Sequence, residues 1–131
     1  MLKKTSAVFG LLFIATGILG FFPNPVISEV GLFHTDFTHN IVHLALGAIL
    51  IFGAMQSDSA ARESMFGVSI FYLALAIVGF FQFGGEDDMG MLLGITEANS
   101  ADNWLHLGLA LSVALGARIA GRNEKDKLPE N

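Results

Sequence analysis

The order of apolar and polar positions predicts four membrane-spanning helices. Long apolar segments occupy positions 6–22, 40–55, 65–83 and 104–119, separated by polar stretches. Each is close to the roughly 17–25 residues that a helix needs to cross a hydrocarbon core of about 30 Å. Apolar side chains occur on every face of each segment, which is typical of a helix surrounded by lipid.

Residues at the segment ends mark where these helices start and stop. Pro23 follows the first segment, and proline cannot continue a helix because it lacks a backbone N–H. Asn40 and Asn103 open the second and fourth segments, and asparagine is a preferred N-cap residue. We therefore expect the second helix to begin at Asn40, the fourth to begin at Asn103, and a polar turn at 56–63.

The composition supports a membrane protein and excludes several kinds of chemistry. Hydrophobic residues make up 53% of the chain and charged residues 15%, with a mean hydropathy of +0.60. A soluble domain has about 25% charged residues because it faces water on all sides. The chain has no cysteine, which excludes disulfides, thiolate metal sites and cysteine nucleophiles. The net charge is −5 and no basic patch is predicted, so nucleic acid is not an expected partner.

The positive charges are segregated along the chain. In a four-span topology all of them lie on one side of the membrane: Lys3, Lys4, Arg62, Arg118, Arg122, Lys125 and Lys127. The two opposite loops, 23–39 and 84–102, contain only acidic charges. Because loops rich in lysine and arginine stay in the cytoplasm, both termini are predicted to be cytoplasmic.

The two halves of the chain resemble each other. Gly20-Phe21-Phe22 in the first half matches Gly79-Phe80-Phe81 in the second. Asn40-Ile41-Val42-His43-Leu44 matches Asn103-Trp104-Leu105-His106-Leu107. The matches predict a tandem duplication of a helical hairpin, with parallel repeats related by an axis along the membrane normal.

The predicted organisation is a single four-helix membrane domain over 1–121, followed by a charged cytoplasmic tail at 122–131. The first repeat covers about 6–55 and the second about 65–119. The spacing between matched motifs is larger in the second repeat, which indicates a small insertion at 84–88.

These motifs resemble a known family. The Gly-x-x-Gly-Phe-Phe-Pro run from Gly17 to Pro23, together with the Asn-x-x-His-Leu and Asn-Trp-Leu-His-Leu runs, is similar to a bacterial membrane family called domain of unknown function 4383. The resemblance covers about 6–121 and implies four membrane helices. It implies no activity, so it identifies no catalytic residue.

The paired Asn-x-x-His motifs have two interpretations. With Asn40 and Asn103 as N-caps, His43 and His106 reach back to the helix ends, as glutamate does in a capping box. Alternatively, the two histidines face each other as ligands of a haem iron, or of a metal ion with help from His39. The expectation is no cofactor, with haem at His43 and His106, supported by Asn40 and Asn103, as the alternative.

Further polar and small residues complete the set of candidates. A polar cluster of His34, Asp36, His39 and His43 places His39 and His43 at i, i+4, a spacing that suits a divalent metal ion. The second repeat has Glu97, Asn99 and Asp102 in place of His34, Asp36 and His39, so we interpret the extra histidines as surface residues. Small residues recur at helical spacing and predict inward-facing packing surfaces. They are Gly108, Ser112, Gly116 and Ala120 on the fourth helix, and Ser69, Tyr72, Ala76 and Gly79 on the third.

The sequence predicts a non-enzymatic protein. It has no acidic or basic residue at mid-depth in a span, no nucleophile with a paired base and no phosphate-binding loop. The favoured function is a structural or accessory subunit of a membrane complex. Its expected partners are the lipid bilayer and other membrane subunits or further copies of itself. A haem-binding or redox module ligated by His43 and His106 is the alternative, and transport of a small neutral molecule is the third.

Overall fold

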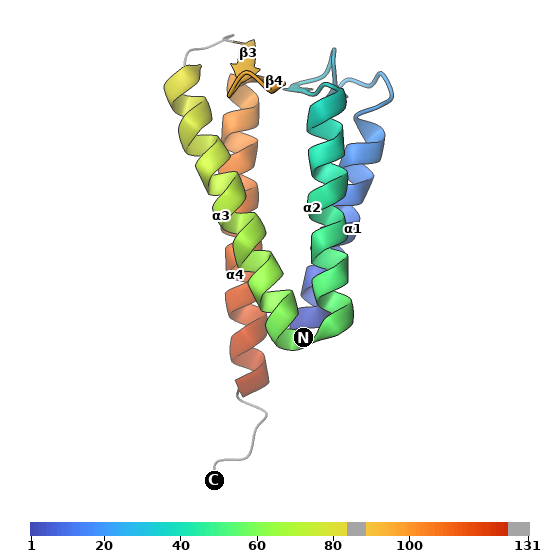
Figure 1. The fold of residues 1–131 in the computed structure, drawn as a ribbon, viewed down its shortest axis with the longest axis vertical. Helices are drawn as coiled ribbons and strands as arrows, with labels where there is room; N and C mark the ends of the chain where they lie inside the picture. The colour runs from blue at the N-terminus through green and yellow to red at the C-terminus, as the bar shows by residue number, and fades with distance from the viewer. Residues whose placement is uncertain (84–88, 126–131) are drawn as a thin grey trace.

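The protein is built from two helical hairpins that lie side by side. The computed structural model describes residues 1–83 and 89–125. In this part of the chain, α1 (Leu2–Leu19) and α2 (Phe37–Gln56) form one hairpin, and α3 (Asp58–Gln82) and α4 (Ser100–Lys125) form the other (Figure 1). All four helices are long and apolar enough to cross a membrane. The predicted four-span helical architecture is therefore confirmed.

Two of the predicted helix starts are wrong. Asp36 is the N-cap of α2, where its side chain accepts a hydrogen bond from the backbone N–H of His39. Asn99 directly precedes α4, which begins at Ser100. Asn40 and Asn103 therefore lie inside their helices, one turn after the start. The apolar segments underestimate the helices because capping residues and first-turn residues are polar and lie outside an apolar run.

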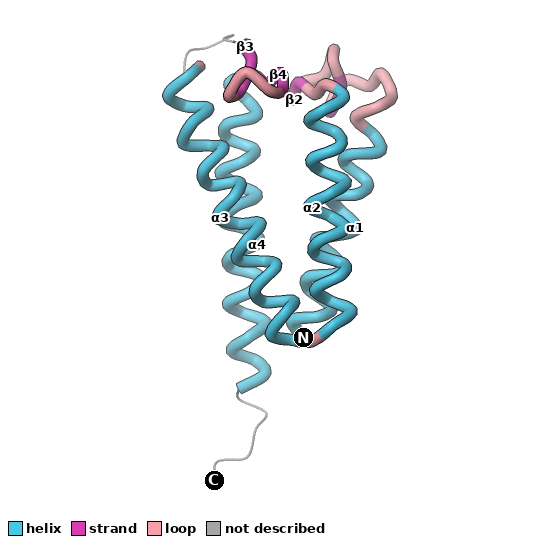
Figure 2. The backbone as a smooth tube through the Cα atoms, in the orientation of Figure 1, coloured by secondary structure: helices cyan, strands magenta, loops and turns pink. Residues whose placement is uncertain are grey.

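Two small sheets lie at one end of the bundle, opposite the α2–α3 turn (Figure 2). In the α1–α2 loop, β1 (Ile27–Ser28) pairs with β2 (Phe33–His34) in parallel. In the α3–α4 loop, β3 (Met89–Leu92) pairs with β4 (Thr96–Asn99) in an antiparallel arrangement. The sequence pattern did not predict these strands. The insertion predicted at 84–88 lies outside the described residues, as does the end of the predicted tail at 126–131.

The two hairpins meet near the α2–α3 turn and diverge toward the strands (Figure 1). Buried serines help to hold each hairpin together. Ser6 on α1 donates to the Leu50 carbonyl on α2 at 2.8 Å, and Ser69 on α3 donates to the Ala110 carbonyl on α4 at 2.8 Å. A hydroxyl bonded to a carbonyl is satisfied within the bundle, which matters where no water is available.

The core lies between the hairpins, and large apolar side chains cover the outside. Phe13, Leu50, Met65, Tyr72 and Val113 are buried together in the core. The exposed surface of all four helices carries large apolar side chains, as a lipid-facing surface requires. The outward apolar surface and the four long helices make the chain an integral membrane protein.

The predicted packing faces are partly confirmed. On α3, Ser69, Tyr72 and Ala76 are buried as expected. On α4, Ala120 is buried, but Gly108 and Ser112 are exposed, so the inward placement predicted for these two is wrong. A step of four residues turns about 40° beyond a full turn, so a ladder of three such steps winds about 120° around the helix and cannot stay on one face.

Candidate functional site

The carboxylate of Asp36 joins the two hairpins at the strand end of the bundle. It accepts hydrogen bonds from the His39 backbone N–H at 2.7 Å, the Thr96 hydroxyl at 2.8 Å and the Glu97 backbone N–H at 2.9 Å. The first bond caps α2, and the other two cross to β4. Burial by itself would raise the pKa of Asp36, but these hydrogen bonds outweigh burial and lower the pKa from its ordinary value.

Asp102 makes a corresponding connection from the second hairpin. Its Oδ2 atom accepts from the Asn99 backbone N–H at 2.8 Å and from the His34 backbone N–H at 3.2 Å. Asn99 returns the first bond, because its Oδ1 atom accepts from the Asp102 backbone N–H at 3.0 Å. The Asn99 amide also donates to the Leu32 carbonyl at 2.9 Å. The start of α4 is thus fixed to the loop of the first hairpin.

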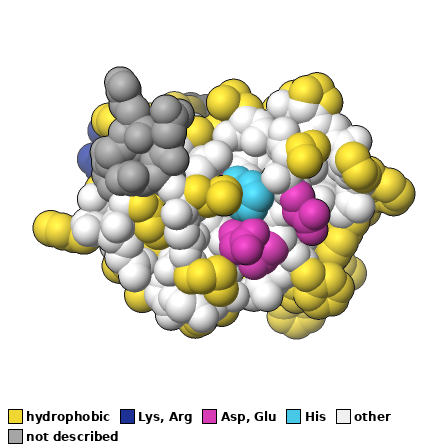
Figure 3. All heavy atoms as spheres, turned by 90° about the horizontal axis from the view of Figure 1, so that it is seen from above, with side chains coloured by type: hydrophobic (Ala, Val, Ile, Leu, Met, Phe, Trp, Pro, Cys, Tyr) yellow, Lys and Arg dark blue, Asp and Glu magenta, His cyan; other side chains and the backbone are white. Residues whose placement is uncertain are grey.

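The His34 imidazole and the Glu97 carboxylate complete the connection, 2.8 Å apart. Figure 3 looks down on this end of the molecule and shows acidic side chains beside a histidine. We call the hydrogen-bonded set of Asp36, Thr96, Glu97, His34 and Asp102 the inter-hairpin clamp.

His39, beside this clamp, was predicted at the surface and is buried instead, with 5% of its surface exposed, and Asp102 within the clamp is fully buried. The prediction is wrong because β2 and β4 bring the two loops together, so that each loop covers the first turn of the other hairpin's helix.

Below the clamp lies a cluster of aromatic and imidazole rings, consisting of His39, His43, Tyr72 and His106. The His39 ring stacks on His43 with centroids 5.1 Å apart, and it lies 5.7 Å from the His106 ring. The Tyr72 ring lies 5.2 Å from His106, and its hydroxyl is 3.3 Å from Nδ1 of His43. We call this set the histidine–tyrosine cluster, and all four side chains are buried.

The cluster contains both histidines predicted as site residues. His43 and His106 belong to the same cluster, and the rings of His39 and Tyr72 each contact both of them. The sequence did not assign Tyr72 to a site, and it gave His39 two interpretations, a helper ligand of a metal ion and a surface residue. The available signal was the i, i+4 spacing of His39 and His43, together with a single tyrosine on an otherwise small-residue face.

Asn40 and Asn103 contact glycines at the end of the preceding helix rather than capping helices. The Asn40 Oδ1 atom lies against the backbone of Gly20, and the Asn103 Oδ1 atom lies against Gly79 in the same way. Asn103 also donates to the Phe83 carbonyl at 2.9 Å. Each asparagine therefore fixes its own helix against the preceding helix of the same hairpin.

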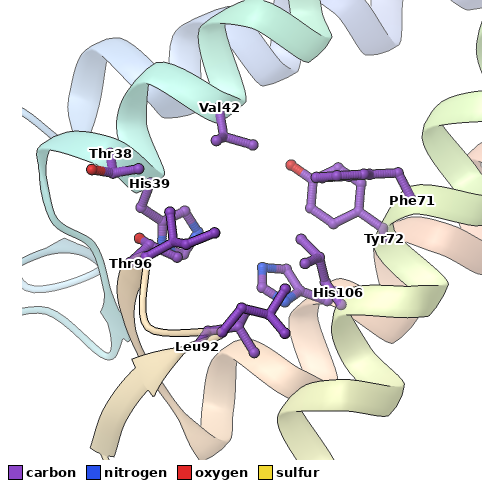
Figure 4. A pocket seen from close by; sticks show the side chains of 11 residues that line it. Thr38, His39, Val42, Phe71, Tyr72, Leu92, Thr96 and His106 are labelled. Atoms are coloured by element: carbon purple, nitrogen blue, oxygen red, sulfur yellow. The ribbon is translucent and has the colours of Figure 1, made fainter.

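A cavity of about 180 Å³ opens beside this cluster (Figure 4). It is lined by apolar side chains from α2, α3 and the β3–β4 hairpin, together with Thr38, His39, Tyr72, Thr96 and His106. Neither ring nitrogen of His106 has a hydrogen-bond partner among the described residues, although the side chain is only 1% exposed. A neutral imidazole offers one donor and one acceptor, so His106 retains both for a polar partner.

The arrangement also bears on metal and haem chemistry. Within residues 1–83 and 89–125, no three histidine, aspartate or glutamate side chains are grouped to hold a metal ion. The cavity is smaller than the roughly 300–1,000 Å³ of typical ligand pockets. It therefore suits a ligand smaller than a macrocycle.

The fold and its buried polar centre define the class as a four-helix integral membrane protein. A family model described as "Domain of unknown function (DUF4383)" matches residues 3–119, so the chain belongs to this family. The resemblance seen in the sequence is thereby confirmed. No curated protein and no solved structure matches the chain.

Proposed function

We propose that the protein is a non-enzymatic accessory subunit of a membrane complex, and that α4 binds a transmembrane helix of another polypeptide. The observation that carries this proposal is the outward position of Gly108. A Cβ at this glycine would meet open space, and Ser112 one turn further along is also exposed. Two small residues four positions apart form the small-x-x-x-small pattern that lets helix backbones approach closely in lipid.

The surroundings of this pair favour a helix as the partner. Trp104, Leu111 and Leu115 are exposed on α4, at 67%, 55% and 57%. Large side chains beside a pair of small residues add van der Waals contact to an approaching helix. Mobile lipid chains make less van der Waals contact with such a surface than a rigid helix does.

The experiment covers this pair of small residues without disturbing the bundle. Gly108→Leu adds a side chain where nothing lies within 4 Å, so the isolated subunit should fold as before. Gly67→Leu on α3 is the matched control, because its Cβ would also meet open space. Affinity purification from native membranes should recover the partner with the wild type and Gly67→Leu, and lose it with Gly108→Leu.

Two outcomes would contradict the proposal. Recovery of the same partner with Gly108→Leu would show that this face of α4 is not the interface. A wild-type protein that purifies from native membranes only as a monomer, or only as a self-associated oligomer, would contradict the accessory role.

Both termini are proposed to be cytoplasmic, in a bacterial inner membrane. The support is that Lys3, Lys4, Arg62 and Arg118 belong to the end of the bundle that holds the N-terminus and the α2–α3 turn, whereas the clamp end carries acidic side chains (Figures 1 and 3). Reporter fusions at each terminus, one active only in the cytoplasm and one active only outside it, test this orientation.

The two hairpins are proposed to descend from a tandem duplication. Two pairs of contacts support this origin. The asparagine of each Asn-x-x-His motif lies against the glycine of a Gly-Phe-Phe motif, and each hairpin has one buried serine bonded to a carbonyl of its second helix. If the duplication holds, Gly20→Ala and Gly79→Ala should change stability in the same direction and by similar amounts.

The alternative is a haem-binding or redox module ligated by His43 and His106. Its support is the presence of both histidines in one buried cluster. The small cavity weighs against it. The absorption spectrum described in the Discussion separates this alternative from the accessory subunit.

A further inference from the structure

We propose that the cavity beside the histidine–tyrosine cluster binds one uncharged six-membered ring that carries a hydrogen-bonding oxygen, with His106 as its polar partner. Phenols, hydroquinones and quinones belong to this chemical class. The proposal concerns the space between the hairpins and is independent of the partner helix proposed for α4.

The size of the cavity selects a single ring. Its volume is about 180 Å³. A cavity of roughly 150 Å³ lined by leucine, isoleucine and phenylalanine is known to hold one benzene molecule. The space beside His106 therefore admits one substituted ring and excludes a porphyrin or a second ring system.

The lining selects an uncharged ligand. Val42, Leu75 and Leu92 provide an apolar surface, and Phe71 and Tyr72 provide aromatic surface. Among the described residues that line the cavity there is no lysine, arginine, aspartate or glutamate. An anion or a cation would lose its hydration without gaining an opposite charge, whereas an uncharged ring loses little.

His106 selects a ring with an oxygen atom. Its two ring nitrogens are buried without a partner among the described residues, and Figure 4 shows the imidazole between Leu92 and Tyr72 at the edge of the cavity. An unpaired polar group in an apolar surrounding is costly, and a ligand that pairs with it removes that cost. A phenol can donate its O–H to the bare nitrogen, and a quinone carbonyl can accept from the N–H.

The rim of the cavity indicates how such a ligand enters. Phe71, Leu93 and Ile95 line the cavity and are 40%, 55% and 61% exposed. A ligand that arrives through the lipid phase therefore meets these apolar side chains at the rim. The route suits a lipid-soluble ring.

The first test compares two rings of nearly equal size on the full-length protein in nanodiscs. Fluorine NMR titrations with 4-fluorophenol and fluorobenzene measure the affinity of each. Wild-type protein should bind both saturably, with 4-fluorophenol tighter by roughly two- to tenfold, as expected for one hydrogen bond. His106→Phe should remove this preference and keep binding of fluorobenzene. Saturable binding of neither ring, or a preference that persists in His106→Phe, would overturn the proposal.

A second variant acts from another helix and leaves His106 in place. Val42→Phe on α2 fills the cavity and should abolish saturable binding of both rings. Glu29→Gln is the control, because Glu29 lies in the α1–α2 loop at the same end and belongs neither to the clamp nor to the residues that line the cavity. If Val42→Phe retains binding of 4-fluorophenol, the ring binds elsewhere and the proposal fails, even where His106→Phe does not fold.

Competition then identifies the source of the ring. Displacement of 4-fluorophenol by a benzoquinone with an isoprenoid tail would assign the site to the ring of a membrane lipid. Displacement by tailless phenols alone would assign it to a free phenol. If neither displaces the probe, the site does not recognise this class of ring and the proposal is wrong.

Discussion

The Asn40 side-chain amide lies in the space that a Cβ on Gly20 would occupy. Asn103 has the same relationship to Gly79. Each contact joins the second helix of a hairpin to the end region of its first helix. The Gly-Phe-Phe and Asn-x-x-His motifs therefore form the two halves of one contact in each hairpin.

Alanine at either glycine should destabilise the bundle. A methyl group at Gly20 or Gly79 would overlap the buried asparagine amide, and overpacking of this kind costs about 1–3 kcal/mol. Unfolding in mixed micelles of increasing SDS content measures the change. Gly67→Ala is the matched control, because it meets open space and gains helix propensity of up to about 1 kcal/mol. Equal stability of Gly20→Ala and wild type would show that the contact is unimportant.

Removing the Asp36 carboxylate should let the two hairpins move apart at the strand end of the bundle. Asp36→Ala deletes the N-cap of α2 and both bonds to β4, at a cost of about 1–3 kcal/mol for the charged bonds. The chain has no cysteine, so Val30→Cys with Leu93→Cys places one spin label in each loop. The label-to-label distance distribution should broaden in Asp36→Ala and stay narrow in Glu29→Ala. An unchanged distribution would mean that other contacts hold the hairpins together.

Acid should weaken the clamp through the same carboxylate. The pKa of Asp36 is lowered in the folded protein from the ordinary 3.8, so folding favours the ionised form. Its contribution to stability is complete above pH 3.8 and is lost as the pH falls through the lower, folded-state value. Thermal unfolding measured between about pH 2 and pH 6 should show this loss in wild type and a smaller loss in Asp36→Asn. Identical pH profiles for the two proteins would argue against this role.

Tyr72→Phe should cost about 0.5–1.5 kcal/mol of stability. The change removes the hydroxyl that lies 3.3 Å from His43 and leaves the ring packing intact. In a His43→Phe background the imidazole partner is already absent. Adding Tyr72→Phe to that background should therefore lower the free energy of unfolding only slightly. The double-mutant cycle, measured by SDS unfolding, isolates the interaction. Purely additive effects would mean that the hydroxyl and the imidazole do not interact.

Protein purified in mild detergent from haem-sufficient cells should be colourless. The cavity is small, and the His39 and Tyr72 rings contact both His43 and His106. Visible spectra with and without dithionite provide the measurement. A Soret band that shifts on reduction and disappears in His43→Ala would instead establish the haem alternative.

Much of the architecture could be predicted from the sequence because the bilayer acts on the chain locally. A span must be apolar over its whole length, so the four helices are visible as four apolar segments. The Asn-x-x-His pairs also drew attention to His43 and His106, since polar residues in a span are costly and stand out. The exact helix starts were missed, because Asp36 and Asn99 belong to polar loops whose structure no periodicity marks.

Only the tertiary structure decided what these residues contact. Asp36 reaches β4 from 60 positions away along the chain, and Tyr72 reaches His43 from 29 positions away. Such pairings depend on how two hairpins dock, which no local pattern encodes. The sequence by itself therefore determined the membrane-spanning elements and the family. The packing of the hairpins decided that His39 is buried, that His106 borders a cavity and that Gly108 faces outward, because these properties depend on neighbours that are distant in sequence.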